Sequence, residues 1–248
     1  MKNIKKELGV QSYCFRNYKK NEDVANCVKD IGLERIELCG VHVDFNDQDS
    51  FDKVINTYRD AGVDIVSIGV VQLTAEESEI RPYFEFAKKA GLKHISVSFQ
   101  PEGMEEVLEL ANKMAEEYDV FLGIHNHGGH HWLGNSQMLK SVFSKAGNRI
   151  GLCLDTAWAL DAGEDPIKMA REFYDRLYCV HFKDFNFDNS GEPEDVIVGT
   201  GNLDLKELID LLEENDYQGI SILEYEGNVD NPVPSLAECV EVMEKEWN

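Results

Sequence analysis

The feature that most constrains the fold is a repeated phrase in which an amphipathic segment ends at a glycine and an apolar run follows at once. Three copies are Ile31-Gly32-Leu33, Ala61-Gly62-Val63 and Ala90-Gly91-Leu92. Glycine after a helix supplies the left-handed C-cap that turns the chain back towards a sheet. Strands that are nearly continuous apolar runs, separated by amphipathic helices, indicate a parallel sheet covered on its faces.

Eight such units follow one another along the chain. The predicted strands are 8–13, 35–38, 63–68, 94–99, 120–126, 150–155, 177–181 and 220–224. The predicted helices are about 21–31, 50–61, 75–90, 103–118, 136–145, 166–173, 205–214 and 235–244. Eight units in 248 residues favour a closed barrel over an open doubly wound sheet. We therefore predict an α/β fold, a single (β/α)8 TIM-barrel domain over residues 1–248, with one long aperiodic loop at 185–200 that is either functional or a surface excursion.

Charge and cysteine usage exclude several classes of function. The net charge of -23 repels phosphate backbones and anionic lipid, so we predict neither a nucleic-acid nor a membrane partner. The six cysteines have no CxxC spacing and mostly lie in apolar runs, which predicts buried free thiols in a reducing compartment. The basic segment 1–6 lacks a following apolar run, so a cytoplasmic protein is expected. The sequence leaves open whether the chain forms a homo-oligomer.

Polar side chains end four successive predicted strands, at the rim where active sites of such barrels are built. They are His125, Asp155, His181 and Glu224. Because neighbouring strands lie about 4.8 Å apart, four side chains on one arc can converge on one point. Two imidazoles and two carboxylates suit one divalent ion of the Mn, Co, Zn, Fe or Mg group rather than calcium.

Each of these residues also has a simpler explanation. Asp155 could be the N-cap of a following turn, His181 a satisfied core histidine, and Glu224 the partner of a lysine. We favour the metal site because all of the simpler explanations would have to coincide at one rim. The segment 123–132 strengthens this interpretation, since it holds four of the seven histidines and starts at a strand end. Strand alternation places His125 and His127 on one side and Asn126 on the other.

The chain resembles the xylose isomerase-like barrel superfamily, which includes sugar isomerases and epimerases, inosose dehydratase and type IV apurinic endonucleases. The motifs that carry the resemblance are Asp155-Thr156, His181-Phe182-Lys183-Asp184, Gly199-Thr200-Gly201-Asn202-Leu203-Asp204, and Tyr217-Gln218-Gly219 leading to Glu224. The resemblance implies one metal held at the ends of strands five to eight, normally by Glu, Asp, His and Glu. His125 departs from this pattern. The endonucleases have a further histidine at the position of Trp158, which argues against DNA repair here.

The resemblance implies a divalent-metal-dependent isomerase or epimerase that acts on a keto or aldo sugar through a metal-stabilised enediolate. Loss of the strand-five carboxylate favours an alternative, a lyase or dehydratase of the inosose dehydratase kind. A sugar-binding barrel without turnover is a third hypothesis. His127 and Glu224 are the candidate bases.

Further residues are assigned to the substrate. Lys183 would stabilise an enediolate or bind an anionic group, or is a surface lysine paired with Asp184. Glu37 and His42 are predicted to orient hydroxyl groups. Trp132 and Trp158 are predicted to stack on a sugar face, or simply to pack.

Overall fold

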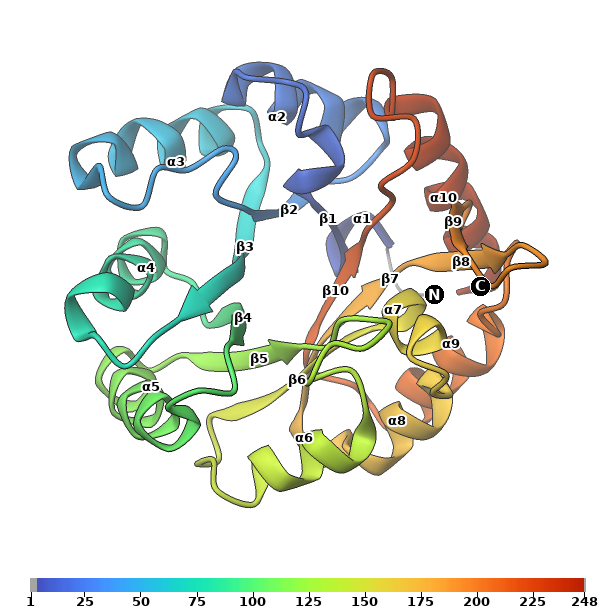
Figure 1. The fold of residues 1–248 in the computed structure, drawn as a ribbon. Coiled ribbons are helices and arrows are strands. Elements are labelled where there is room, and N and C mark those ends of the chain that lie inside the picture. The colour runs from blue at the N-terminus through green and yellow to red at the C-terminus, as the bar shows by residue number, and fades with distance from the viewer. Residues whose placement is uncertain (1–3, 248) are drawn as a thin grey trace.

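The computed structural model describes residues 4–247, so the segment 1–6 begins outside the described part. Eight parallel strands close into a barrel in the order β1-β10-β7-β6-β5-β4-β3-β2, with helices around it (Figure 1). This confirms the predicted (β/α)8 barrel. The strands are β1 Leu8–Gln11, β2 Arg35–Leu38, β3 Asp64–Leu73, β4 His94–Phe99, β5 Phe121–His125, β6 Ile150–Asp155, β7 Leu177–Phe182 and β10 Ile220–Leu223.

The long helices cover the outer face of the barrel because they present an apolar stripe to it. In α9, the residues Leu205, Leu208, Ile209 and Leu212 recur at helical spacing and are buried. The helices are α1 Ile4–Glu7, α2 Asn21–Asp30, α3 Phe51–Asp60, α4 Glu77–Ala90, α5 Met104–Tyr118, α6 Ser136–Phe143, α7 Thr156–Asp161, α8 Pro166–Glu172, α9 Leu205–Glu214 and α10 Val233–Glu246. Gly91 caps α4 with a φ of 74°, as the repeated phrase predicts.

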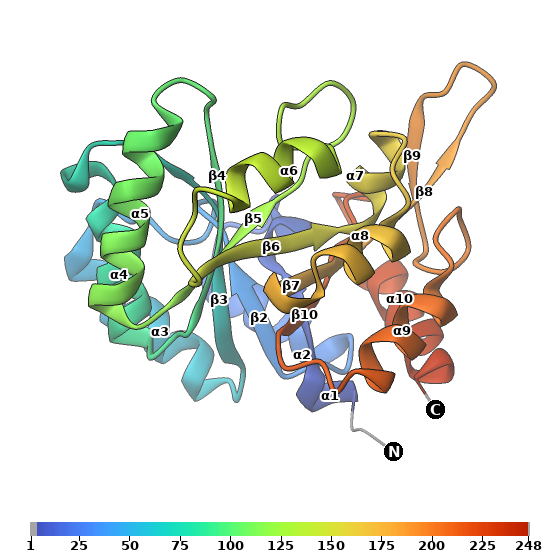
Figure 2. The same cartoon turned by 90° about the horizontal axis from the view of Figure 1, so that it is seen from below.

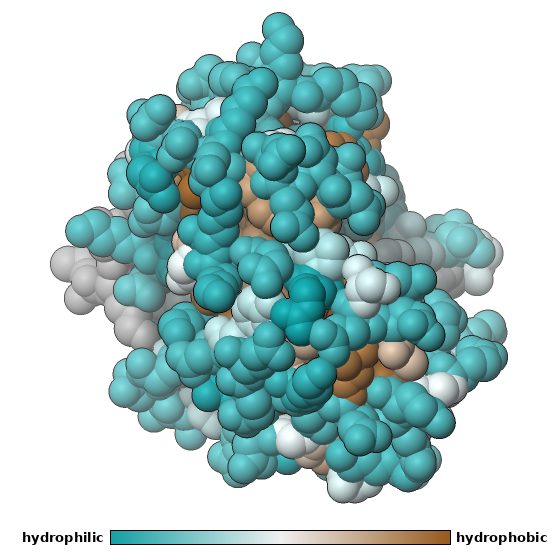
Figure 3. Space-filling model, turned by 90° about the vertical axis from the view of Figure 1, so that its left-hand side faces the viewer, coloured by the Kyte–Doolittle hydropathy of each residue, from teal (hydrophilic) through white to brown (hydrophobic). Residues whose placement is uncertain are grey.

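The side of the molecule seen in Figure 3 is mostly hydrophilic. None of the helices within residues 4–247 combines the length and the apolar character needed to cross a lipid bilayer. The six cysteines are all buried and free, as predicted. The acidic pairs Glu105-Glu106, Glu116-Glu117 and Glu213-Glu214 are exposed on helices α5 and α9, where charged side chains are solvated.

Several local features differ from the predictions. Strand β1 ends at Gln11 instead of residue 13, because a 3-10 helix, Ser12–Phe15, follows it directly. Strand β3 extends to Leu73 instead of ending at residue 68, with a register shift between Ile68 and Val71 that interrupts its apolar alternation. Helix α7 was not predicted, because six residues are too few to show helical periodicity. The predicted loop 185–200 contains an antiparallel hairpin, β8 Asp184–Phe187 and β9 Pro193–Val196, which projects beyond the barrel (Figure 2).

Candidate metal centre

The barrel brings the four predicted metal ligands together. His125 ends β5, Asp155 ends β6, His181 lies in β7, and Glu224 directly follows β10. One ligand atom from each of the four lies within 4.8 Å of those of the others. The side chains are buried, with Glu224 the most exposed of them at 8%. The register explains the convergence, since Asp155 and His181 are direct partners across β6 and β7.

The polar atoms of this cluster fit a divalent cation. Across residues 4–247, both ring nitrogens of His125 and the Oδ2 atom of Asp155 are buried without a hydrogen-bond partner. Buried polar atoms are normally satisfied, so a group of unpartnered nitrogen and oxygen atoms indicates a missing ligand. Two carboxylates and two neutral imidazoles also balance the charge of a divalent ion.

Asp155 can serve both as the N-cap of a helix and as a metal ligand. Its Oδ1 accepts a hydrogen bond of 2.8 Å from the backbone N–H of Trp158 and so caps α7. Its Oδ2 lies 3.5 Å from His125 Nε2 and remains available to a cation. Asn126 points the other way, as predicted, and pairs with the backbone of Asp155 through both its amide atoms.

The cluster opens into a cavity of about 430 Å³. Two of the four ligands, His125 and Glu224, line it together with His127 and Trp158. The rings of His125 and His127 lie 4.7 Å apart, centroid to centroid, so alternation along β5 is carried into the loop. The remaining lining residues are Gln11, Tyr13, Cys39, Gly40, Val41, Gly69, Val70 and Glu226. A cavity of this size suits a small molecule of sugar size.

A protein-family model described as xylose isomerase-like TIM barrel matches residues 26–246. The chain belongs to this family. Inosose dehydratase of Clostridium tetani is 26% identical over 133 residues, which cover 48% of this chain and 45% of that protein. The match therefore spans less than half of the relative's length.

Solved structures with the same fold extend over nearly the whole chain. The probable 3-DHS dehydratase of Bacillus anthracis, involved in petrobactin synthesis, superposes with a TM-score of 0.77 at 15% identity, over 96% of this chain and 98% of that one. The 3-keto-D-glucoside 4-epimerase of E. coli gives a TM-score of 0.76 at 14% identity, over 96% and 99%. These structures show that the barrel fold is shared over nearly the whole chain.

The surroundings of Glu224 and His127 give these two side chains different charges at neutral pH. Burial raises the pKa of Glu224, but the charge of Lys183 and the hydrogen bond from His181 outweigh it, so the pKa lies well below its usual range. Burial, followed by the charge of His125, lowers the pKa of His127 to about 4. At neutral pH Glu224 is therefore a carboxylate and His127 a neutral imidazole.

Lys183 is a buried cation beside the cavity and not a surface lysine. Its Nζ contacts Glu226, lies 4.0 Å from Asp195 Oδ2, and stands 5.0 Å from the centroid of the Trp158 ring. Burial lowers the pKa of Lys183, but the charges of surrounding carboxylates, Glu224 first, raise it above the ordinary value. The suggested pairing with Asp184 is wrong, because Asp184 accepts hydrogen bonds from loop backbone N–H groups. Sequence reasoning missed the contact with Glu226, although alternation after Glu224 would place both carboxylates on one side.

Two predicted substrate residues lie away from the cavity. His42 Nε2 is 3.0 Å from the carbonyl oxygen of Tyr18, beside a separate surface hollow near Lys19. The indole N–H of Trp132 donates to the carbonyl oxygen of Phe99, and its ring packs edge-on against that of Phe99. These positions argue against the predicted sugar contacts, because both side chains are engaged in holding loops to the barrel.

Glu37, also predicted to bind substrate, is fully buried inside the barrel and faces His181. Its carboxylate accepts hydrogen bonds from Gln11 and Ser96, and Oε1 lies 3.1 Å from His181 Nε2. A carboxylate at Nε2 favours the proton on that nitrogen and leaves the Nδ1 lone pair for a metal. Glu37 therefore fits a residue that orients a ligand better than one that touches substrate.

We expect Glu37→Gln to weaken Mn²⁺ binding by about 10-fold to 100-fold, because the amide no longer fixes the proton position on His181. Isothermal titration of the metal-free protein with Mn²⁺ measures the effect. Glu34→Gln is the control, since Glu34 precedes the same strand but pairs with Lys29 at the surface. Equal affinities of the two variants would contradict the assignment.

Proposed function

We propose that this chain is a divalent-metal-dependent enzyme that removes a proton next to the carbonyl group of a keto sugar or keto polyol. The supporting observation is the group of four buried side chains with unpartnered atoms, placed at a sugar-sized cavity that His127 also lines. A divalent ion held by His125, Asp155, His181 and Glu224 would polarise the carbonyl and acidify the neighbouring C–H bond.

His127 is the base that we favour. It lines the cavity, and its Nδ1 has no hydrogen-bond partner among residues 4–247. Glu224 is less available, because its Oε2 lies 2.7 Å from His181 Nδ1. Trp158 offers a ring face at the cavity wall, and Gln11 and Tyr13 offer polar groups to hydroxyls. Lys183 has no exposed surface, so it acts through its charge, which holds the neighbouring carboxylates ionised.

Removal of the proton next to the carbonyl group leaves a carbanion. We favour dehydration as the reaction that follows. The inosose dehydratases similar to this chain support it. His125 supports dehydration as well. Proton exchange across one carbon by two glutamates needs a carboxylate at the end of strand five, and a histidine stands there in this chain. Isomerisation or epimerisation is the second candidate, favoured by the presence of two candidate bases, His127 and Glu224, at one cavity.

A panel assay in deuterated water tests the proposal. The metal-loaded protein is incubated with inososes, keto sugars and aldo sugars, and the products are analysed by mass spectrometry and NMR. Loss of water identifies a dehydratase, whereas deuterium at carbon without loss of water identifies an isomerase or epimerase. Absence of both from every compound would contradict the proposal and favour a binding protein.

His127→Asn is expected to lower the rate with the active compound by about 100-fold, because the amide cannot accept the proton. The metal content should remain that of the wild type. His130→Asn is the matched control, since His130 is exposed in the same loop. An unchanged rate in His127→Asn would remove His127 from the role of base.

A further inference from the structure

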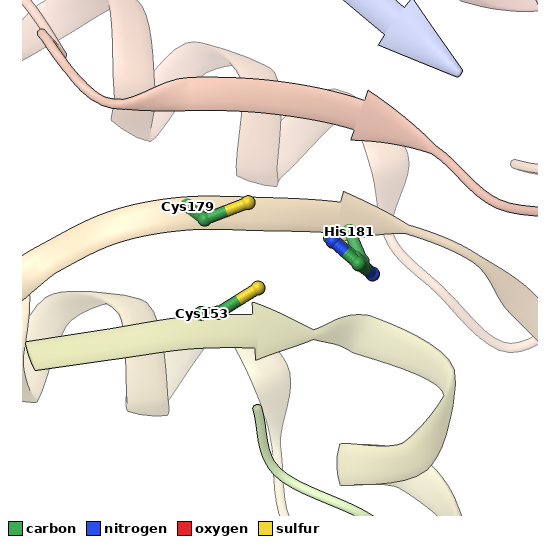
Figure 4. A group of neighbouring side chains, drawn as sticks. All are labelled: Cys153, Cys179 and His181. Atoms are coloured by element: carbon green, nitrogen blue, oxygen red, sulfur yellow. The ribbon is translucent and has the colours of Figure 1, made fainter. Parts of the chain in front are cut away.

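We propose a second cation site of different chemistry inside the barrel, formed by Cys153, Cys179 and His181 and suited to a thiophilic ion such as Zn²⁺. Cys153 lies in β6 and Cys179 in β7, and the two are direct partners in the strand register. His181 follows Cys179 by two residues and so faces the same side of β7. Figure 4 shows the two thiols and the imidazole gathered between the two strands.

The geometry allows one ion to be shared by the three side chains. A ligand atom of each lies within 4.8 Å of those of the other two, and none of the residues is more than 2% exposed. Sulfur ligands about 2.3 Å from a tetrahedral zinc are about 3.8 Å from one another. Binding thus needs only small side-chain rotations. It releases the two thiol protons to solvent, and the two thiolates then balance the charge of the ion.

His181 has one nitrogen for each site. Its Nδ1 lies 2.7 Å from Glu224 Oε2, whereas its Nε2 is buried and faces the barrel interior beside Glu37. Glu37 Oε1 lies 3.1 Å from Nε2 and would hold a proton there until a cation replaces it. Ser96 Oγ, which donates to Glu37, is 3.6 Å from Cys153 Sγ, while Ile220 and Ile222 pack against the two thiols on their apolar side.

Ligand chemistry distinguishes the two sites. Thiolates select soft ions such as Zn²⁺ and Cd²⁺, whereas carboxylates with imidazoles also accept Mn²⁺ and Mg²⁺. The other cysteines provide internal controls. Cys239, for example, is equally buried but lies in helix α10, on the outside of the barrel. Among the described residues, Cys153 and Cys179 are the cysteines that meet a histidine in such a group.

Cadmium titration of the reduced, metal-free protein tests this site, because Cd²⁺ bound to thiolate gives an ultraviolet charge-transfer band and Cd²⁺ bound to carboxylate and imidazole does not. The wild type should develop the band, with saturation by two equivalents because Cd²⁺ can also fill the four-ligand centre. Cys153→Ser and Cys179→Ser should each lose most of it. Cys239→Ser should keep it in full.

Asp155→Asn separates this proposal from the proposed function. That variant should lose metal binding at the four-ligand centre. It should retain the cadmium band, since Asp155 is not a ligand of the site formed by Cys153, Cys179 and His181. Absence of the band from the wild type, or its persistence in both Cys153→Ser and Cys179→Ser, would overturn the proposal. If the serine variants do not fold, cadmium-edge X-ray absorption of the wild type decides, because a shell without sulfur excludes the site.

Discussion

Asp155→Asn is expected to abolish tight divalent-metal binding at the four-ligand centre and to lower turnover by on the order of 1000-fold, or about 4 kcal/mol. The asparagine amide has the shape of the carboxylate, so its oxygen can still accept the hydrogen bond from Trp158 N–H that caps α7. The variant loses the negative charge and the ligand oxygen Oδ2, which is buried beside His125. Function should therefore change much more than stability.

Metal analysis after dialysis, the rate with the active compound and a thermal melt measure the three quantities. Asp165→Asn is a matched control. Asp165 caps α8 by accepting hydrogen bonds from the backbone N–H groups of Ile167 and Lys168, and it is not one of the four proposed ligands. The control should keep wild-type metal content and rate. An Asp155→Asn protein that retains its metal and its rate would refute the four-ligand centre.

Asp184→Ala is expected to lower the free energy of unfolding by about 3–5 kcal/mol, the largest stability effect among the variants considered. The carboxylate is buried and accepts hydrogen bonds of 2.8–2.9 Å from the backbone N–H groups of Gly199, Gly201 and Leu203. Alanine would leave these three donors without their acceptor. The loop would also lose the anchor that fixes Gly199 at a φ of 82°.

Urea unfolding measures this loss. Asp188→Ala is the control, because Asp188 also accepts hydrogen bonds from neighbouring groups, Ser190 and Glu192, but lies exposed in the β8–β9 turn. Asp188→Ala should lower the free energy of unfolding by less than about 1 kcal/mol, since water replaces the lost acceptor. Similar destabilisation by both variants would show that burial of the Asp184 network contributes little.

The sequence predicted the scaffold well, because strands and helices of this length carry their own periodicity. Strands β2, β4 and β6 have the predicted bounds, and so does helix α9. The failures are local. Helix α7 is too short for its periodicity to be seen, and the β8–β9 hairpin lacks the continuous apolar pattern of the barrel strands.

The candidate site was predictable to the extent that it follows from strand ends. Parallel strands end at the same edge, so His125, Asp155 and His181 were brought together by a rule that needs no coordinates. The positions of Glu37, His42 and Trp132 were not predictable in this way. Whether a polar side chain at a strand end faces the cavity, the barrel interior or a loop depends on its hydrogen-bond partners, and those come from distant parts of the chain.

The sequence by itself determined the parallel barrel, the rim on which polar groups gather and the four side chains that converge there, because alternation and apolar runs are properties of short segments. Only the tertiary structure decided that Lys183 is buried against Glu226, that individual atoms of His125 and Asp155 remain without partners, and that Cys153 and Cys179 meet His181. Barrel closure sets these contacts, since it fixes the register between strands that the local sequence pattern leaves free.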